Sequence, residues 1–293
     1  MSIVLASGES VALSLSGEAE PRTIVVTPSD PSCEGFDTST ITTIMVNGAA
    51  GDEGVTIDQA GSAPFPNENT VSIMLALGDG FDALLIVGRN TADTIGFGAD
   101  GISLDAGSTP DVTGADTVES FGVNPGGGDD VVSGKQGGDL GASFASPLSI
   151  GGDVGHDTLT GGSGDDTIDG GVGDDALRGA GGRDRLAGDT GSDVVSGGGN
   201  NDVLLGGSGG DRLKGADGSD TMRGDGGRDT MTGGEGSDSV IGGEGNDRVK
   251  GGKDDDVVKG NNRNDQLYGG PGNDHCLGGP GADSMTGCES GHL

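Results

Sequence analysis

Between Gly152 and Thr286 the chain repeats a fixed pattern of polar and apolar positions every nine residues. The 15 nonapeptides follow one another without an insertion; examples are Gly161-Gly-Ser-Gly-Asp-Asp-Thr-Ile-Asp169 and Gly242-Gly-Glu-Gly-Asn-Asp-Arg-Val-Lys250. Position 1 is Gly, position 6 is Asp and position 8 is apolar in all 15 units, and position 4 is Gly in 12 of them. A period held in phase over this length indicates a solenoid built from a short repeated unit.

The pattern predicts one short strand in each unit. Three residues around position 8 form the strand, with the apolar side chain inward and its neighbours outward. The Gly-rich positions turn the chain, because Gly adopts backbone conformations that other residues avoid. Two units make a coil of 18 residues, and stacked coils pair parallel strands about 4.8 Å apart. The apolar residues then form two columns, one of Leu159, Leu177, Val195, Leu213, Met231, Val249, Leu267 and Met285, the other of Ile168, Leu186, Leu204, Met222, Val240, Val258 and Cys276.

The rest of the chain is less regular. The nine-residue register runs back through Asp139 and Asp130, with Leu148 in place of Asp in the unit between them and the tract, so we expect the repeat region at 125–286 and a tail at 287–293. Residues 1–124 hold the strand candidates Val11–Leu15, Thr23–Val26, Ile41–Val46 and Val71–Leu75. They predict an irregular β-rich region, interpreted as degenerate solenoid coils with an N-terminal cap; a separate small β-sandwich is the alternative.

Composition decides which classes of protein remain. The chain has 66 Gly and 10 Pro among 293 residues, no Trp, one Tyr and a formal net charge of −33. A nucleic-acid-binding protein is not expected, because it needs a basic face and this chain has 15 Lys and Arg against 48 Asp and Glu. A membrane span is not expected either, because the chain has no run of 18 apolar residues. Such Gly content disfavours helices and leaves a disordered acidic chain or a fold that tolerates Gly. The fixed phase of Asp and the apolar residue favours the fold, which is all-β: a parallel β-roll or β-helix solenoid.

Stacking would align the position-6 carboxylates along two edges. At a spacing of about 5 Å neighbouring carboxylates repel by about 3 kcal/mol at an effective dielectric constant near 20. Calcium takes six to eight carboxylate and carbonyl oxygens, which Asp and a Gly-rich turn supply, whereas magnesium needs a tighter octahedron and no Cys/His cluster suggests zinc. The candidate metal ligands are Asp130, Asp139, Asp157, Asp166, Asp175, Asp184, Asp193, Asp202, Asp211, Asp220, Asp229, Asp238, Asp247, Asp256, Asp265, Asp274 and Asp283.

The expected cofactor is calcium, in several copies. Eight Asp residues of the 15-unit tract on one edge would enclose seven ions and seven on the other edge six, so about 13 ions would reduce the charge from −33 to about −7. The small core cannot offset the entropy of ordering the tract, so metal binding is the remaining stabilising contribution. We therefore expect a largely disordered calcium-free chain and a β-rich calcium-bound one.

The nonapeptide resembles the G-G-x-G-x-D-x-U-x repeat of RTX, or haemolysin-type, calcium-binding proteins. The resemblance covers 125–286. It implies a parallel β-roll with calcium between stacked loops, and a bacterial protein that is exported and acts outside the cell or at its surface.

Other functions agree less well with the sequence than calcium binding. A surface adhesin or interaction module acting through residues 1–124, with the β-roll as a calcium-dependent scaffold, is the alternative; its protein or glycan partner is unknown. Ice binding requires a regular Thr row, which position 7 lacks, and sugar binding usually requires aromatic platforms, of which the repeat tract offers Tyr268. An enzyme is not expected, because residues 1–124 contain no His and no recognisable nucleophile constellation.

Two further features carry open alternatives. Cys276 takes an inward position, which favours a small core residue, while a disulfide with Cys288 or Cys33 is the alternative. Lys and Arg at positions 7 and 9, such as Arg212 and Lys250, are interpreted as solubilising the outer strand faces, with a basic partner-binding stripe as the alternative.

Overall fold

The computed structural model describes residues 121–134 and 143–289 in full, the backbone of Ser290–His292, and the strands of the first 120 residues. Side chains in that first part are described at Leu84, Leu85, Ile86, Ile95 and Ile102. The chain divides into two compact units, Met1–Ile150 and Gly151–Leu293. Every regular element among the described residues is a strand, so none of them is a helix that could cross a membrane. This confirms the all-β solenoid expected from the sequence.

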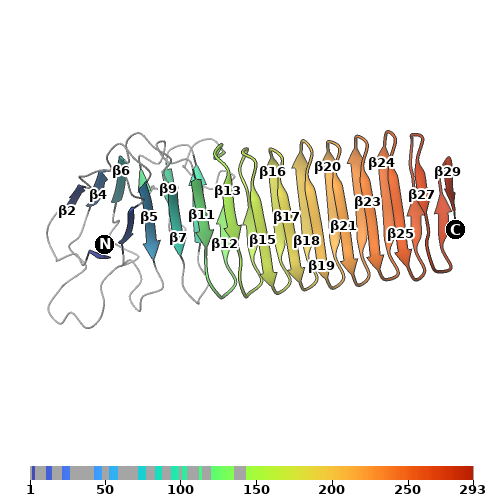
Figure 1. Cartoon of the computed structure of the whole chain (residues 1–293), viewed down its shortest axis with the longest axis horizontal. Helices are drawn as coiled ribbons and strands as arrows, with labels where there is room; N and C mark the ends of the chain where they lie inside the picture. The colour runs from blue at the N-terminus through green and yellow to red at the C-terminus, as the bar shows by residue number, and fades with distance from the viewer. Residues whose placement is uncertain are drawn as a thin grey trace. The chain divides into compact units, whose positions relative to one another are not determined.

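The second unit winds two strands into each coil (Figure 1). Its strands are β14 (Thr158–Thr160), β15 (Thr167–Val172), β16 (Ala176–Gly181), β17 (Arg185–Thr190), β18 (Val194–Gly199), β19 (Val203–Ser208), β20 (Arg212–Asp217), β21 (Thr221–Gly226), β22 (Thr230–Glu235), β23 (Ser239–Glu244), β24 (Arg248–Lys253), β25 (Val257–Asn262), β26 (Gln266–Tyr268), β27 (His275–Leu277), β28 (Ser284–Thr286) and β29 (Ser290–His292).

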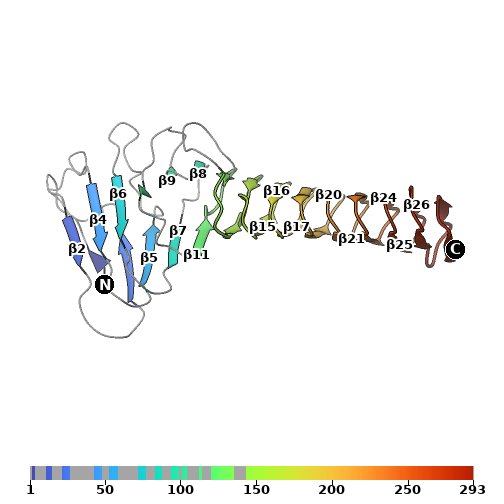
Figure 2. The same cartoon turned by 90° about the horizontal axis from the view of Figure 1, so that it is seen from above.

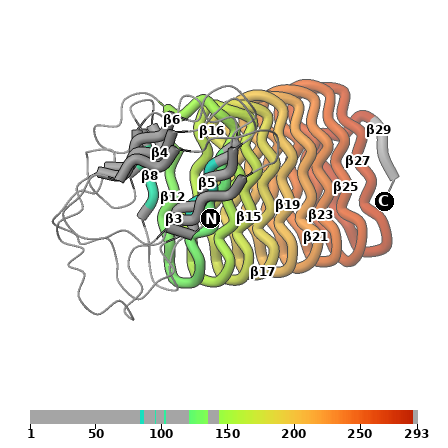
Figure 3. Tube along the Cα trace, turned by 60° about the vertical axis from the view of Figure 1, so that its left-hand side comes forward, coloured from blue at the N-terminus to red at the C-terminus, as the bar shows by residue number. Residues whose placement is uncertain are grey.

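Even-numbered and odd-numbered strands of this unit form two parallel sheets. Figure 2 places β16, β20 and β24 along one side and β17, β21 and β25 along the other, and Figure 3 follows the winding that links them. Leu159 is in register with Leu177, and Ile168 with Leu186, so each coil takes two nonapeptides, as the period predicts. Most strands are longer than the predicted three residues, because positions 1–3 of the following nonapeptide continue the pairing.

The apolar columns form the core between the two sheets. From Leu159 to Cys276 every position-8 side chain is at most 3% exposed. Met285, in the last unit, is partly exposed. Outward neighbours alternate with these residues along each strand, which is the period-two burial expected of a strand with one face against the core.

The turns depend on left-handed backbone at positions 2 and 4. Gly173, at position 4, has φ 142°, and a Cβ there would fall against the main chain of Gly155 in the preceding coil. The three units without Gly at position 4 keep the left-handed conformation, with φ of 72° at Asn200, 72° at Asp254 and 81° at Arg263. The turn is therefore imposed by the stacking of coils, and non-Gly residues there adopt a conformation that is unfavourable for L-amino acids.

The first unit is also wound from parallel strands, but with longer coils. Its strands are β1 (Ser2–Ile3), β2 (Val11–Ser14), β3 (Arg22–Val26), β4 (Thr43–Asn47), β5 (Glu53–Asp58), β6 (Ser72–Ala76), β7 (Ala83–Val87), β8 (Thr94–Gly98), β9 (Gly101–Ser103), β10 (Val112–Thr113), β11 (Ser120–Asn124), β12 (Val131–Ser133) and β13 (Leu148–Gly151).

Strands of the first unit alternate between two sheets up to β7, as in a solenoid. Gly54 pairs with Ala83, and Val11 pairs with Ile44, so both pairs span more chain than two nonapeptides do. The strand pairs of this unit are parallel, except that β9 is antiparallel to β8 and β10. The four strand candidates correspond to β2, β3, β4 and β6, while β5 was missed because its sequence, Glu-Gly-Val-Thr-Ile-Asp, carries little apolar signal.

The nine-residue register is interrupted before residue 151. Val132 in β12 and Ile150 in β13 are two nonapeptides apart yet belong to different sheets, whereas a regular register would place them in one. Leu148, which stands where the repeat has Asp, is 2% exposed and pairs with Phe121 of β11. A buried Leu replaces the ladder Asp here, so uniform two-nonapeptide coils begin with the second unit.

The last coil is shorter than the others. β29 pairs with β27 through His275 and Ser290, which is three residues less than two full nonapeptides. Glu289 replaces the position-6 Asp of a following coil: its Oε2 accepts a hydrogen bond from the Asp274 N–H (2.6 Å), and its own N–H donates to the Asp274 carbonyl (3.1 Å). The Glu289 carboxylate thus accepts the hydrogen bond that a position-6 Asp accepts in the regular coils, and its N–H replaces the position-7 amide that donates to the Asp carbonyl there.

A disulfide between Cys276 and Cys288 closes this short coil, with the two Cα atoms 5.8 Å apart. Cys276 is fully buried, as its inward position predicts, but it is not a free thiol. The interpretation of Cys276 as a simple core residue was incomplete, and of the two disulfide partners left open the structure selects Cys288.

Loss of this disulfide should loosen the C-terminal end. The closed loop spans 12 residues, so Cys288→Ser is expected to cost up to about 3 kcal/mol of local stability. Amide hydrogen exchange at residues 274–277 should then accelerate by at least tenfold, while exchange at Leu213, in the middle of the unit, stays unchanged. Equal protection of both regions in variant and parent would show that the disulfide does not stabilise the end of the solenoid.

Candidate metal centre

A buried Asp precedes the start of each strand along both edges of the second unit. These residues are Asp157, Asp175, Asp193, Asp211, Asp229, Asp247 and Asp265 on the even-strand edge and Asp166, Asp184, Asp202, Asp220, Asp238, Asp256 and Asp274 on the odd-strand edge, each at most 2% exposed. Asp283, before β28, is partly exposed. Asp130 of the first unit is buried, and Asp139 lies outside the described residues. We call the aligned carboxylates of the second unit the Asp ladders.

One carboxylate oxygen in each rung binds the main chain of the preceding coil. The Asp211 N–H donates to Asp229 Oδ1 (2.9 Å), and the Asp229 N–H donates to Asp247 Oδ1 (2.9 Å). The same bond recurs from Asp157 to Asp283 on one edge and from Asp166 to Asp274 on the other, at 2.8–3.0 Å. Each Asp carbonyl also accepts from the position-7 amide of the next coil, as in Arg248 N–H to Asp229 (2.9 Å). These bonds fix the carboxylates in place.

The second carboxylate oxygen, Oδ2, is buried and has no hydrogen-bond partner within the described part of the chain. This holds for Asp175, Asp184, Asp193, Asp202, Asp211, Asp220, Asp229, Asp238, Asp247, Asp256, Asp265, Asp274 and Asp283. Asp166 differs, because its Oδ2 accepts the Gly162 N–H at 2.7 Å. A buried ionised oxygen without a partner is strongly unfavourable in a protein made of these residues alone.

Burial changes the acidity of the ladders. Desolvation, partly offset by the hydrogen bond from the preceding coil, raises the pKa of Asp184, Asp229 and Asp238 to about 7. In the same way the pKa of four further rungs is raised to about 6, those of Asp193, Asp202, Asp256 and Asp265. Neighbouring carboxylates add to the rise; for Asp229 they are Asp247 and Asp211. The folded unit therefore disfavours the ionised state that these groups have in water at neutral pH.

At most rungs the space beside the position-1 Gly is bordered both by the unpartnered Oδ2 and by a main-chain carbonyl oxygen of the next coil. A Cβ placed on Gly242, at position 1, would be 2.6 Å from Asp247 Oδ2 and 2.8 Å from the carbonyl oxygen of Gly260 in the next coil. Within the described ranges no group of three or more His, Cys, Asp or Glu side chains converges on one point. A cation at the ladders would thus be held by carboxylate and main-chain oxygens together. This all-oxygen donor set fits calcium and does not fit zinc.

Comparison with known proteins agrees with this donor set. The family model of the RTX calcium-binding nonapeptide repeat matches four times, at residues 151–186, 178–213, 214–249 and 250–285. Residues 151–285 are RTX repeats, and we call the second unit, Gly151–Leu293, the RTX unit. A search of curated proteins found no match. The second unit is therefore a calcium-binding β-roll, and the resemblance inferred from the sequence is confirmed over this range; the earlier residues 125–150 lie outside the match.

The RTX turns contain a second set of bonds that sequence reasoning missed. Position-5 side chains accept hydrogen bonds from the position-5 amide of the following coil, as in Arg183 N–H to Asp165 Oδ1 (2.8 Å) and Ser219 N–H to Asn201 Oδ1 (2.9 Å). His156 is exposed, and its Nδ1 accepts the Asp174 N–H at 2.8 Å. The signal was present, since Asx, Ser or His fills position 5 in most units.

The raised pKa values of the ladder carboxyls predict how the calcium-free RTX unit responds to pH. A carboxyl whose pKa is higher folded than unfolded stabilises the fold at low pH, and this contribution is lost as pH rises through the folded value. The seven groups have folded pKa values of about 6 to 7 against an ordinary Asp value of 3.8, so the loss runs from about pH 4 to about pH 7. Far-ultraviolet circular dichroism of calcium-free protein should therefore show more β-structure at about pH 5 than at about pH 7.5. A calcium-free spectrum with the opposite trend would contradict the burial of these carboxyls.

Proposed function

We propose that the RTX unit takes up several calcium ions between successive coils and folds only when they are bound. The observation that carries the proposal is the row of buried, unpartnered Asp Oδ2 atoms, most of them on the same side of the turn as a main-chain carbonyl oxygen of the next coil. Carboxylates aligned without counter-charge oppose folding, and a divalent cation that binds the folded chain alone reverses this. The residues that hold the ions are the Asp ladders and the carbonyl groups of the Gly-rich turns. Two ladders leave room for about 13 ions.

We further propose that the protein works outside the cell or at its surface. At low calcium the net charge of −33 is uncompensated and the unit stays unfolded, a state compatible with passage through an export channel. At high external calcium about 13 ions would lower the net charge to about −7 and allow the coils to stack. Calcium is in this way the signal that separates the exported from the working form. In this proposal the chain is not an enzyme, since no catalytic constellation was recognised in residues 1–124.

An interaction module is the second candidate. The first unit is compact by itself, and its coils are longer than those of the RTX unit, as the pairing of Gly54 with Ala83 illustrates. In this alternative the first unit contacts a partner and the RTX unit is its calcium-dependent scaffold. The test is capture of a surface component by the full chain. Capture that is kept after charge-neutral changes in the RTX unit, but is lost when the exposed Leu85 of β7 is replaced, would favour this alternative.

Isothermal titration calorimetry with calcium tests the first proposal. We expect binding of about 13 ions per chain, coupled to a gain of β-structure, and no comparable response to magnesium, which keeps its waters. Binding of one or two ions, or equal binding of magnesium, would contradict ladders that each hold a series of calcium ions. The exposed variant Asp217→Asn serves as the control, because it removes one charge away from the ladders.

A further inference from the structure

The two outer faces of the RTX unit carry different charges. On the even-numbered strands from β14 to β28, the outward positions 7 and 9 contain no acid and five cations, Arg178, Arg212, Lys214, Arg248 and Lys250. In the whole chain the acids outnumber the bases by 48 to 15. All five side chains are exposed. On the odd-numbered strands from β15 to β27, the equivalent positions carry Arg185, Arg223 and Lys259 together with Asp169 and several apolar residues. We call the first set the cationic face.

Strand register sets the spacing of these charges. Arg212 pairs with Thr230 and Thr230 with Arg248, while Lys214 pairs with Thr232 and Thr232 with Lys250. The cations therefore stand on alternate strands, about 9.6 Å apart along the solenoid, and about 6.6 Å apart along each strand. Thr hydroxyls lie between the cations of β20 and β24, and on β18 Ser196 and the exposed Val194 lie beside Lys214 and Arg212. The result is a flat array of positive charges and hydrogen-bonding groups that runs across the strands.

One end of this array is held in a defined conformation. The Arg248 guanidinium lies 4.4 Å from the centre of the Tyr268 ring, and its Nη1 donates to Gln266 Oε1 (3.1 Å) and Tyr268 Oη (3.0 Å). Beside it is a hollow of about 420 Å³ whose lining includes Arg228, Thr230, Arg248 and Asn264. Arg228, at position 5, thus extends the positive charge over this edge of the sheet. None of these contacts neutralises Arg248, so its charge remains available to a ligand.

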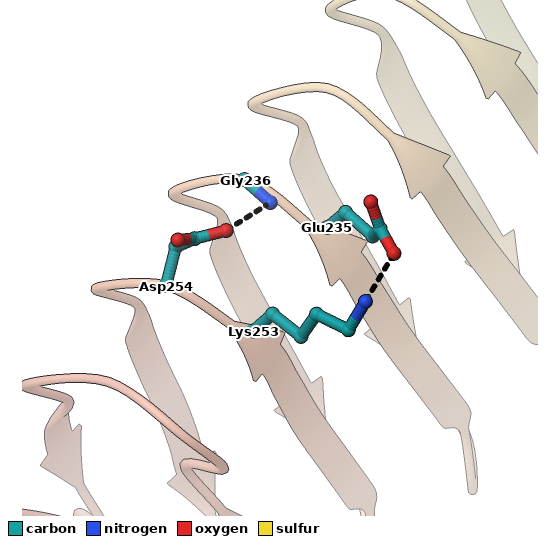
Figure 4. A network of polar contacts seen from close by, with 4 residues as sticks. All are labelled: Glu235, Gly236, Lys253 and Asp254. Atoms are coloured by element: carbon teal, nitrogen blue, oxygen red, sulfur yellow. Dashed lines mark hydrogen bonds and ion pairs between the residues drawn. The ribbon is translucent and has the colours of Figure 1, made fainter.

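The opposite edge of the array is acidic. Asp217 and Glu235 stand at the ends of β20 and β22, and Glu235 is paired with Lys253 (Figure 4). Next to this pair, Asp254 Oδ2 accepts the Gly236 N–H at 3.1 Å, as Figure 4 also shows. A ligand that fits must therefore be narrow. It can lie along the solenoid over the cations but cannot spread toward this edge without meeting carboxylates.

We propose that the cationic face binds one extended chain of an acidic polysaccharide, laid along the solenoid axis. The two-strand spacing of the cations is close to the length of a disaccharide in an extended glycan, so an anionic group on alternate sugars meets Arg212 and Arg248 in turn. The Thr hydroxyls between them are matched to sugar hydroxyls, and the hollow beside Arg248 accommodates a bulky substituent. From β16 to β24 the face extends about 19 Å, which corresponds to a tetrasaccharide.

Charge and shape argue against nucleic acid as the ligand. A duplex is wider than the array and would place phosphates against Asp217 and Glu235 at the ends of β20 and β22. Single-stranded nucleic acid binds through rows of aromatic platforms, and this face offers one ring, Tyr268, already covered by Arg248. An acidic polysaccharide does not need a wide face, and its charged groups can be held by Arg and Lys in place of the aromatic platforms on which sugar binding usually depends.

The test uses the calcium-loaded full chain and size-defined heparin oligosaccharides as probes. The variant Arg212→Gln, Lys214→Gln, Arg248→Gln removes three charges from the cationic face. The matched control Arg185→Gln, Arg223→Gln, Lys259→Gln removes two Arg and one Lys from the other face. We expect the first variant to lose affinity at least tenfold and the control less than threefold. Affinity should rise up to the tetrasaccharide and then level off, and should weaken with salt because the contact is electrostatic.

Several results would overturn the proposal: no binding of any heparin oligosaccharide, an equal loss in both triple variants, or binding of single-stranded or duplex DNA as tight as that of heparin. Uncharged dextran of the same length should not bind, and binding of it would also overturn the electrostatic basis. The proposal depends on a folded RTX unit, so circular dichroism in calcium accompanies each measurement. A variant that fails to gain β-structure reports on the proposed calcium-dependent folding, whereas a folded variant reports on the cationic face.

Discussion

Asp229→Asn should weaken calcium binding and yet leave the calcium-free chain no less structured than the parent. Asn keeps an oxygen to accept the Asp211 N–H, so the bond at 2.9 Å between coils survives. It replaces the charged, unpartnered Oδ2 by a neutral amide. Without calcium the change removes a buried charge whose pKa burial raises to about 7. With calcium it removes a ligand, and each lost site costs about 2.7 kcal/mol at a calcium concentration 100 times Kd.

Circular dichroism of the calcium-free chain and equilibrium unfolding in urea at saturating calcium measure the two effects separately. The matched control is Asp217→Asn, which makes the same change of charge at an exposed position of the same solenoid. We expect the control to change the free energy of unfolding in calcium by about 0.5 kcal/mol at most, as for most surface substitutions, and to leave the calcium-free spectrum unchanged. A loss of residual β-structure in calcium-free Asp229→Asn, together with a loss of stability in calcium, would show that Asp229 is only a structural residue.

Gly242→Ala should disrupt the turn that places carbonyl oxygens beside the ladder. The new methyl group would stand 2.6 Å from Asp247 Oδ2 and 2.8 Å from the Gly260 carbonyl oxygen, and the Asp247 carboxylate is held in place through Oδ1 by the Asp229 N–H. Overpacking of this kind costs about 1–3 kcal/mol. The loss should be accompanied by fewer bound calcium ions, because the methyl group occupies the space between the two donors. Calorimetric stoichiometry and calcium-dependent thermal unfolding measure both effects.

Gly226→Ala is the control for this substitution. Gly226, at position 3, is not among the residues with left-handed φ, and the nearest atom to an added Cβ is the Gly207 carbonyl oxygen at 3.8 Å. Ala should therefore be tolerated there, with stoichiometry unchanged. If Gly242→Ala behaved like Gly226→Ala, position 1 would not be the place where the donors converge.

Strict periodicity explains how much of the fold the sequence could predict. Fifteen units in phase determine the two-nonapeptide coil, the two parallel sheets and the columns from Leu159 to Cys276, since a slip of one residue would turn every apolar side chain outward. Where the period fails, prediction failed with it. The coil closed by Glu289 is shorter than two nonapeptides, and the antiparallel pair of β8 and β9 interrupts the parallel winding. Neither feature is part of a sequence repeat from which it could be predicted.

The candidate site divides in a similar way. The spacing of the position-6 Asp residues predicted two rows of carboxylates, but the amino-acid sequence does not distinguish the two oxygens of one carboxylate. The structure assigns Oδ1 to the neighbouring coil's amide and leaves Oδ2 beside a carbonyl, as at Asp247 and Gly260. The hydrogen bonds of the position-5 side chains were missed for a related reason. Asx, Ser and His are different residue types, and their common role as hydrogen-bond acceptors is visible only once the coils are stacked.

The most direct measurement is the radius of gyration of the full chain by small-angle X-ray scattering, with circular dichroism on the same samples, in excess calcium and after exhaustive chelation. Calcium-dependent folding predicts a β-rich protein in calcium and, without it, an expanded chain that has lost most of that β-structure, with full recovery when calcium returns. A chelated chain as compact and as β-rich as the calcium-loaded one would contradict the account.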